Sequence, residues 1–369
     1  MKNITIVAGA RPNFMKIGPI INEIKNVNKN HPVLDYSLVH TGQHYDKNMS
    51  KNFFHDLGIP EPDINLGCGS GNQSEITAKI MIGFQDYLQK NKTDLVIVVG
   101  DVTSTMACSI VAKKMFIPVA HIEAGIRSGD MTMPEEINRI VTDSISDYFF
   151  TTTKRAGKLL ESQGVNMNKI FFVGNTMIDS LLQNISKFRK PKVWDEAGLN
   201  NYNYLVITLH RPSNVDFEIQ LERILSEIIN HSDDYTIIFP MHPRTKKTFN
   251  KLNISNKNLV VTGPLSYLEF NFLVSKSKAV ITDSGGITEE TTILKVPCLT
   301  LRDNTERPET ITIGTNELVG SDPTKIKNYL KILFDNNWKK GGVPEKWDGK
   351  TSKRIVEKII KIVYEKQKI

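Results

Sequence analysis

Short apolar runs alternate with longer stretches of helical spacing along most of the chain. The first run, residues 4–7, is followed by apolar residues at helical intervals from about Phe14 to Val27. Residues 94–99 are almost wholly apolar, as in a strand that is buried on both faces of a parallel sheet. This alternation predicts an α/β fold with parallel sheets. The expected strands are residues 4–7, 37–39, 94–99, 119–122, 148–151 and 170–173, then 204–208, 236–240, 259–261, 279–282 and 297–301.

The chain has 369 residues, which exceeds the usual size of a single hydrophobic core. A polar, turn-rich stretch, residues 187–203, separates the two series of strands. We therefore expect two Rossmann-like domains, residues 1–185 and 186–369, and a ligand at the carboxyl ends of the strands, in the cleft where the two sheets face each other. The final helix is assigned to the second domain, and an alternative packs it back on the first.

Composition restricts the class of partner. The net charge is +7, but the basic residues are dispersed, so an anionic small molecule is expected rather than nucleic acid. No apolar run reaches 18 residues and no signal peptide precedes the first strand, so we expect a cytoplasmic protein without membrane contact. The three cysteines, Cys68, Cys108 and Cys298, are too dispersed to predict a disulfide framework or a thiolate zinc site.

A phosphate site is expected in the second half. The strand that ends at Thr282 runs into Asp283, Ser284, Gly285 and Gly286, and a helical pattern follows. Small residues at such a turn let an anion approach the free N–H groups of the helix. Glu290, one turn later, is placed to bind a ribose, and Arg307 suits phosphate. The alternative is an ordinary turn between strand and helix.

The turn after the first strand also suits a diphosphate. Arg11 follows Gly9 and Ala10, and Lys16 lies on the next helix. The dinucleotide fingerprint G-x-G-x-x-G is absent here, which argues against a nicotinamide-dependent oxidoreductase. Surface cations without a function are the alternative.

Three carboxylates follow strands of the first half. Asp101 and Glu123 come directly after the third and fourth expected strands, and Glu135 begins a nearby helix. Clustered carboxylates raise one another's pKa, which makes them candidates for proton transfer. Taken singly, Asp101 could cap a helix and Glu135 could favour a helix start.

Histidine and arginine follow two strands of the second half. His210 and Arg211 end one strand, and His242 and Arg244 end the next. Two such pairs at equivalent positions suggest a rim that binds anions. No metal-ligand spacing, nucleophile elbow or Walker loop is present, so we predict no metal and no cofactor.

Together these segments resemble the non-hydrolysing UDP-N-acetylglucosamine 2-epimerase family, nearly from end to end. The matching segments are GARP (9–12), HTGQHY (40–45), GD (100–101), HIEAG (121–125), PEEINR (134–139), HR (210–211), DSGGITEE (283–290), RD (302–303) and TERPE (305–309). The resemblance implies the GT-B-like architecture of two Rossmann-like domains, and a homodimer.

The resemblance also implies a mechanism. The family removes the C2 proton, eliminates UDP to give a 2-acetamidoglucal, and adds UDP back with a proton delivered to the opposite face of C2. Asp101, Glu123, Glu135 and His210 would then be catalytic, with base and acid unassigned among the carboxylates. The residues implied to bind substrate are Arg11, Lys16, Arg139, His242, Phe270, Ser284, Gly285, Gly286, Glu290 and Arg307. Phe270 would flank the uracil, and a plain core position is its alternative.

A second UDP-sugar activates many bacterial members of the family. The residues implied for that site are Gln43, His44, Gln73, Glu136 and Arg211. Asn72 stands where the family pattern has arginine, which puts activation by UDP-N-acetylglucosamine in doubt.

The substrate is expected to be an N-acetylated UDP-hexosamine, with UDP-N-acetylglucosamine to UDP-N-acetylmannosamine foremost. Related diacetamido uronates or 6-deoxy amino sugars are alternatives. A hydrolysing epimerase, a glycosyltransferase of the same architecture, and a nucleotide-sugar sensor without turnover complete the alternatives.

Overall fold

The computed structural model describes residues 1–29, 31–43, 54 and 56–365, and the chain divides into two compact units. The first unit contains Met1–Gln183 and the C-terminal segment from Glu345 onward, and the second is Asn184–Pro344. The final helix thus lies in the first unit, although it follows the second in sequence.

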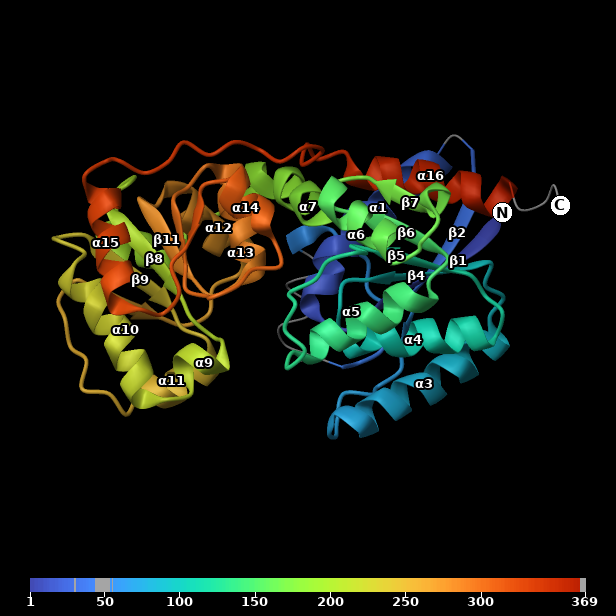
Figure 1. Cartoon of the computed structure of the whole chain (residues 1–369), viewed down its shortest axis with the longest axis horizontal. Coiled ribbons are helices and arrows are strands. Elements are labelled where there is room, and N and C mark those ends of the chain that lie inside the picture. The colour runs from blue at the N-terminus through green and yellow to red at the C-terminus, as the bar shows by residue number, and fades with distance from the viewer. Residues whose placement is uncertain (30, 44–53, 55, 366–369) are drawn as a thin grey trace. The chain divides into compact units, whose positions relative to one another are not determined.

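The first unit is a parallel sheet with helices on its faces (Figure 1). In the described part of the chain its strand order is β3-β2-β1-β4-β5-β6-β7. The strands are β1 (Lys2–Ala8), β2 (Leu34–His40), β3 (Ile64–Asn65), β4 (Leu95–Val99), β5 (Val119–Ile122), β6 (Tyr148–Thr151) and β7 (Ile170–Phe172). The helices are α1 (Arg11–Asn28), α3 (Gln73–Lys90), α4 (Thr103–Lys114), α5 (Pro134–Ile145), α6 (Lys154–Ser162), α7 (Thr176–Asn184) and α16 (Thr351–Glu365).

The second unit repeats this plan with the strand order β10-β9-β8-β11-β12-β13, again parallel among the described residues. The strands are β8 (Tyr204–Thr208), β9 (Thr236–Pro240), β10 (Leu259–Thr262), β11 (Ala279–Thr282), β12 (Cys298–Thr300) and β13 (Asn316–Leu318). The helices are α8 (Lys192–Glu196), α9 (Pro212–Val215), α10 (Glu218–Asn230), α11 (Pro243–Phe249), α12 (Tyr267–Lys276), α13 (Gly285–Leu294), α14 (Pro308–Thr312) and α15 (Pro323–Phe334).

The two sheets confirm the expected α/β class and nearly all expected strands. β3 and β13 were not expected, because two or three residues that include Asn65, Asn316 and Glu317 give no apolar run. Helix α1 begins three residues before the expected Phe14, since Pro12 in its first turn already has the helical φ angle.

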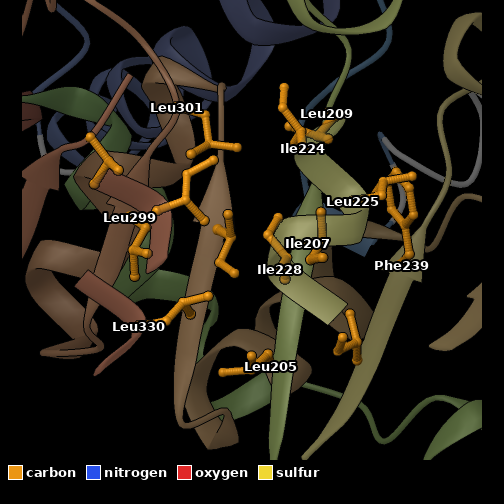
Figure 2. Packing of buried hydrophobic residues seen from close by; sticks show 14 of the residues in the cluster. Leu205, Ile207, Leu209, Ile224, Leu225, Ile228, Phe239, Leu299, Leu301 and Leu330 are labelled. Carbon is orange, nitrogen blue, oxygen red and sulfur yellow. The ribbon is translucent and has the colours of Figure 1, made fainter. Parts of the chain in front are cut away.

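Strand β8 shows why the central strands read as continuous apolar runs. Leu205 and Ile207 face one side of the sheet, where they pack in a cluster with Ile224 and Ile228 of α10 (Figure 2). Tyr204 and Val206 face the other side, in a separate cluster. Alternate residues of one strand therefore fill two different hydrophobic layers.

The C-terminal run of lysines forms the amphipathic helix α16. Its apolar face, which includes Ile355 and Ile359, is buried, and the helix contacts α1. Among the described residues, no helix has the length and apolar character needed to span a membrane. The three cysteines are buried and form no disulfide with one another.

Candidate active site

In each sheet the first strands of the chain are added on one side of a central strand and the later strands on the other side. The point where the side changes lies between two neighbouring strands. β1 lies beside β4 in the first unit, and β8 lies beside β11 in the second. Ligands of doubly wound folds bind outside the carboxyl ends of strands at such a point. The turns that follow these strands hold Asp101, His210 and Ser284, three of the residues that the sequence singled out.

Glu123 follows β5 and forms an ion pair with Lys16 of α1. The Lys16 Nζ lies 2.5 Å from Glu123 Oε2, and both side chains are largely buried. Glu123 has φ 71°, which is in the left-handed region that costs a residue with a side chain about 1–2 kcal/mol. Backbone strain of this kind persists where surrounding contacts fix it, often at functional sites.

Asp101 follows β4 and is held by two residues of α5. Arg139 donates from Nε and Nη2 to Asp101 Oδ2, at 3.1 and 2.5 Å. Asn138 donates to the Asp101 carbonyl at 2.8 Å. Arg139 also pairs with Glu136 at 2.8 Å, so one buried guanidinium joins two carboxylates. Such fixation leaves the Asp101 carboxylate with a defined position.

Glu135 lies in the first turn of the same helix and is partly exposed. Within the described part of the chain it forms no ion pair, unlike Asp101 and Glu123. The structure therefore gives two of the three expected carboxylates their own cation, which the sequence did not predict. Lys16 and Arg139, expected to bind substrate, are those cations.

The turn after β1 is clamped by Asn13. Its Oδ1 accepts the N–H groups of Gly9 and Ala10, each at 3.0 Å, and its Nδ2 donates to the Val99 carbonyl at 3.1 Å. This side chain joins the ends of β1 and β4. Arg11, at the start of α1, is exposed beside that clamp.

A buried histidine and aspartate lie beneath these turns. His121 Nδ1 lies 2.7 Å from Asp143 Oδ1, and His121 Nε2 lies 2.9 Å from the Gly100 carbonyl oxygen. Asp143 Oδ2 accepts Arg127 Nη1 at 2.6 Å and the Gly125 N–H at 3.1 Å. Burial opposes ionisation of Asp143, but His121 and Arg127 hold its pKa below the usual range.

In the second unit Asp283 organises the turn after β8. It accepts the N–H groups of His210 and Arg211 at 3.0–3.1 Å and the Asn214 amide at 3.1 Å. The His210 Nδ1 lies 2.9 Å from Asp283 Oδ1. Although burial opposes its ionisation, these hydrogen bonds hold the pKa of Asp283 below the usual range. These contacts with Asp283 orient His210, and the His210 ring remains half-exposed.

The expected phosphate turn begins helix α13. Ser284, Gly285 and Gly286 are partly exposed, and no side chain caps the helix. A Cβ at Gly286 would meet nothing within 4 Å among the described atoms, so there is open space beside the backbone of this residue. The first-turn N–H groups therefore provide a partial positive charge suited to an anion.

Two arginines near this helix form ion pairs with glutamates. Arg307 donates to Glu289, and Arg302 makes a bidentate pair with Glu306 at 2.8 and 2.9 Å. Glu290 is buried and lies beside the Tyr267 phenol. The burial of Tyr267, and next the charge of Glu290, raise the pKa of this phenol well above its usual value. The expected ribose and phosphate residues thus lie around one helix.

His242 caps helix α11 and lies near His210. Its Nδ1 accepts the N–H of Arg244 at 3.2 Å, and the two histidine rings are 6.2 Å apart between centroids. Burial, and next the charges of His210 and Arg244, lower the pKa of His242. Phe270 packs against the hydrophobic cluster around Leu273 and Val280, so its core position accounts for part of its burial.

Comparison with known proteins places this chain in a family. The family model described as UDP-N-acetylglucosamine 2-epimerase matches residues 26–360. The chain belongs to the UDP-N-acetylglucosamine 2-epimerase family. This membership makes the protein an enzyme of the isomerase class, as the sequence motifs indicated.

The relatives of this epimerase match over nearly their whole length. The UDP-N-acetylglucosamine 2-epimerase of Methanocaldococcus jannaschii is 42% identical over 96% of this chain and 97% of its own. Its crystal structure in complex with UDP-GlcNAc and UDP superposes with a TM-score of 0.85, over 97% of this chain and 99% of that one. The UDP-2,3-diacetamido-2,3-dideoxy-D-glucuronate 2-epimerase of Pseudomonas aeruginosa is 38% identical over 98% of this chain and 100% of its own. The GT-B-like fold class follows from these structural neighbours.

The residues implied for an activator site lie in both units of the epimerase. Gln43 Oε1 accepts the Ser104 hydroxyl at 2.9 Å, and Gln73 Oε1 accepts that of Thr103 at 3.3 Å, so both amides reach the start of α4. Glu136 accepts the N–H of Ser128 at 2.9 Å, and Arg211 donates from Nε to the Asp283 carbonyl at 3.0 Å. His44 lies outside the described residues.

Asn72, which stands where the family pattern has arginine, has a structural role in the epimerase. Its side chain accepts the N–H of Glu75 at 3.0 Å, and the Glu75 carboxylate accepts the N–H of Asn72 at 3.1 Å. This capping box starts helix α3. An arginine cannot cap a helix in this way.

Sequence reasoning missed the side chains that fix the site rather than form it. Asn13, Asn138 and Asp143 are buried polar residues that bind the backbone or side chains of the expected catalytic turns. Their signal is a polar residue on the buried face of an otherwise amphipathic helix. Among the described residues, no group of three or more His, Cys, Asp or Glu side chains is placed to hold a metal ion.

Proposed function

We propose that this enzyme interconverts UDP-N-acetylglucosamine and UDP-N-acetylmannosamine by a non-hydrolysing C2 epimerisation. The observation that most supports it is the archaeal relative, 42% identical, whose crystal structure holds both UDP-GlcNAc and UDP. UDP-GlcNAc is the sugar nucleotide with which such a reaction begins, and UDP is the group that leaves.

The reaction balances without an oxidant or a reductant. A base takes the proton from C2, the bond between C1 and the UDP oxygen breaks, and a double bond forms between C1 and C2. UDP then adds back to C1 while an acid delivers a proton to the opposite face of C2. Since two faces of C2 exchange protons, two proton-transfer groups are needed.

The first unit supplies the proposed proton-transfer groups. Asp101 and Glu123 lie at the carboxyl ends of adjacent strands, and each is fixed by one cation, Arg139 or Lys16. Glu135 is the third candidate, on the helix that holds Asp101.

The second unit supplies the proposed binding site for UDP. The uncapped start of α13 and the half-exposed His210 would stabilise negative charge on the leaving diphosphate. Glu290 would hold the ribose, and Phe270 would flank the uracil. Arg11, exposed at the start of α1, is a further cation proposed to bind substrate.

Replacement of Asp101 by asparagine tests the proposal. Asp101→Asn keeps the size of the side chain but removes its capacity to transfer a proton, so turnover should fall by about 10²–10⁴-fold. UDP affinity, measured by calorimetry, should change by less than about threefold, because the proposed UDP site uses other residues. Asp195→Asn, in an exposed ion pair with Lys190, is the matched control and should retain full turnover. Equal turnover in Asp101→Asn and the wild type would refute this role.

A second candidate substrate is the diacetamido uronate. The Pseudomonas relative named for that substrate is 38% identical over nearly the whole chain, close to the identity of the archaeal relative. Comparing kcat/KM for the two UDP-sugars decides between them, because specificity is the ratio of these values.

A further inference from the structure

His121 is completely buried, and both of its ring nitrogens face acceptors. Nδ1 lies 2.7 Å from a carboxylate oxygen of Asp143, and Nε2 lies 2.9 Å from the carbonyl oxygen of Gly100. A neutral imidazole has a single N–H, so it can donate to only one of them. Both contacts are hydrogen bonds when the ring carries two protons and a positive charge.

The alternative, a proton on Asp143 and a neutral ring, conflicts with the other contacts of this carboxylate. Asp143 Oδ2 accepts Arg127 Nη1 at 2.6 Å and the Gly125 N–H at 3.1 Å. A positive guanidinium and a backbone N–H both favour the ionised form of Asp143. The proton shared by Asp143 and His121 therefore belongs on the imidazole.

The pair is tied to both turns that hold the proposed proton-transfer groups. Through Nε2, His121 holds the carbonyl of Gly100, the residue directly before Asp101. Asp143 binds the side chain of His121 and the N–H of Gly125, which bracket Glu123 in the sequence. Glu123 lies between these two anchors with its backbone in the left-handed region.

We propose that protonated His121 and ionised Asp143 form a positioning pair that holds the Asp101 and Glu123 turns in their reactive arrangement. Neither side chain is proposed to contact the substrate. The role rests on the proposed function, in which Asp101 and Glu123 transfer the C2 proton. Among the described residues, Arg127 on the loop after β5 pairs with Asp143, while Lys16 on α1 and Arg139 on α5 pair with the carboxylates of the two turns, Glu123 and Asp101.

The charge of the ring is tested by nitrogen-15 NMR of protein labelled in its eight histidines. The signals of His121 are those that disappear in His121→Gln, or, should that variant not fold, those that change in Asp143→Asn. The wild-type ring should show two nitrogen-bound protons in the folded enzyme under the conditions of the kinetic assay. A wild-type ring with one proton would overturn the proposal.

The positioning role is tested by kinetics of the same variants. His121→Gln and Asp143→Asn should lower kcat by about 10–100-fold, because small displacements of reacting groups cost rates of that order. KM and UDP affinity should change by less than about threefold. The control His231→Gln, at the partly exposed C-terminal end of α10, should retain the wild-type kcat. Wild-type kcat in a folded Asp143→Asn variant would overturn the role.

The pH profile separates positioning from a merely structural effect. In Asp143→Asn the ring loses the carboxylate that stabilises its charge, so kcat relative to wild type should recover as the pH falls and the ring regains its second proton. A ratio that is independent of pH would contradict the proposal. If the wild type converts no UDP-sugar at all, the proposed function fails, and the NMR measurement still decides the charge of His121.

Discussion

Two left-handed backbone positions lie at the centre of the site. Gly100 has φ 69° and Glu123 has φ 71°, and their turns follow neighbouring strands. Glycine adopts this conformation without steric cost, whereas Glu123 adopts it against a preference of about 1–2 kcal/mol. The proposed role of Glu123 requires the carboxylate that glycine lacks, and the contacts of Asp143 with His121 and Gly125 hold the chain on either side of it.

Replacement of Gly100 by alanine should impair both stability and turnover. A Cβ at Gly100 would lie 3.2 Å from Lys16 Nζ and 3.4 Å from Asn13 Nδ2. We expect a loss of about 1–2 kcal/mol from the backbone conformation, and a lower kcat because Lys16 and its partner Glu123 are displaced. Urea unfolding and steady-state kinetics measure the two effects.

Gly164→Ala is the matched control for this substitution. Gly164 also lies in the first unit with a positive φ, 87°, but a Cβ there meets nothing within 4 Å among the described atoms. The Gly164→Ala variant should therefore lose a similar amount of stability and keep the wild-type turnover. If Gly100→Ala also keeps full turnover, the close packing around Lys16 is irrelevant to catalysis.

At the scale of elements, helix α16 is fixed to the first unit by a carboxylate from another helix. Asp179 of α7 accepts the N–H groups of Thr351 and Ser352 at 3.1 and 2.7 Å, and also the Ser352 hydroxyl at 2.7 Å. These are the first residues of α16. Asp179 thus acts as an N-cap supplied from a distant part of the chain.

Removal of this cap should weaken the first unit. Asp179→Ala leaves buried N–H groups without their acceptor, which should lower the free energy of unfolding by about 1–3 kcal/mol. Asp322→Ala, which removes the exposed cap of α15, is the control and should cost about 1 kcal/mol. Equal losses in the two variants would show that burial of the Asp179 cap adds nothing.

The loss in Asp179→Ala should also depend on pH. Burial raises the pKa of Asp179 above its unfolded value despite the hydrogen bonds that it accepts. The folded state then binds more protons between the two pKa values, so the stability that this group contributes falls as the pH rises through the folded value. The stability difference between wild type and Asp179→Ala should therefore be larger at acidic than at neutral pH, as urea titrations at several pH values would show.

At the scale of the whole molecule, the features that could be predicted from the sequence are those with a local pattern, namely the apolar runs of the central strands and the residues of the turns that follow them. The buried strands β4 and β8 were predictable, because apolar runs of five residues between helical patterns have few other interpretations. So was the placement of Asp101, Glu123 and Ser284 directly after strands. The edge strands β3 and β13 were not, since they have two or three residues each.

Contacts between residues distant in sequence were beyond prediction. The pairing of Lys16 with Glu123, at a separation of 107 residues, depends on how α1 packs against the sheet. The same holds for the return of α16 to the first unit, which a single sequence cannot distinguish from packing on the second. The sequence predicted three interacting carboxylates but not their ion pairs with Lys16 and Arg139. The residues next to a lysine or arginine in the sequence do not indicate which distant carboxylate it will contact.

The central claim is reversible proton exchange at C2 of a UDP-N-acetylhexosamine. Proton NMR of the purified enzyme with UDP-N-acetylglucosamine in deuterated water tests it most directly. We predict that deuterium enters C2 while UDP-N-acetylmannosamine appears and the bond to UDP is retained in both sugars. Free N-acetylmannosamine together with UDP would instead indicate a hydrolysing epimerase. A C2 signal that keeps its full proton intensity, with the diacetamido uronate equally unchanged, would contradict the account.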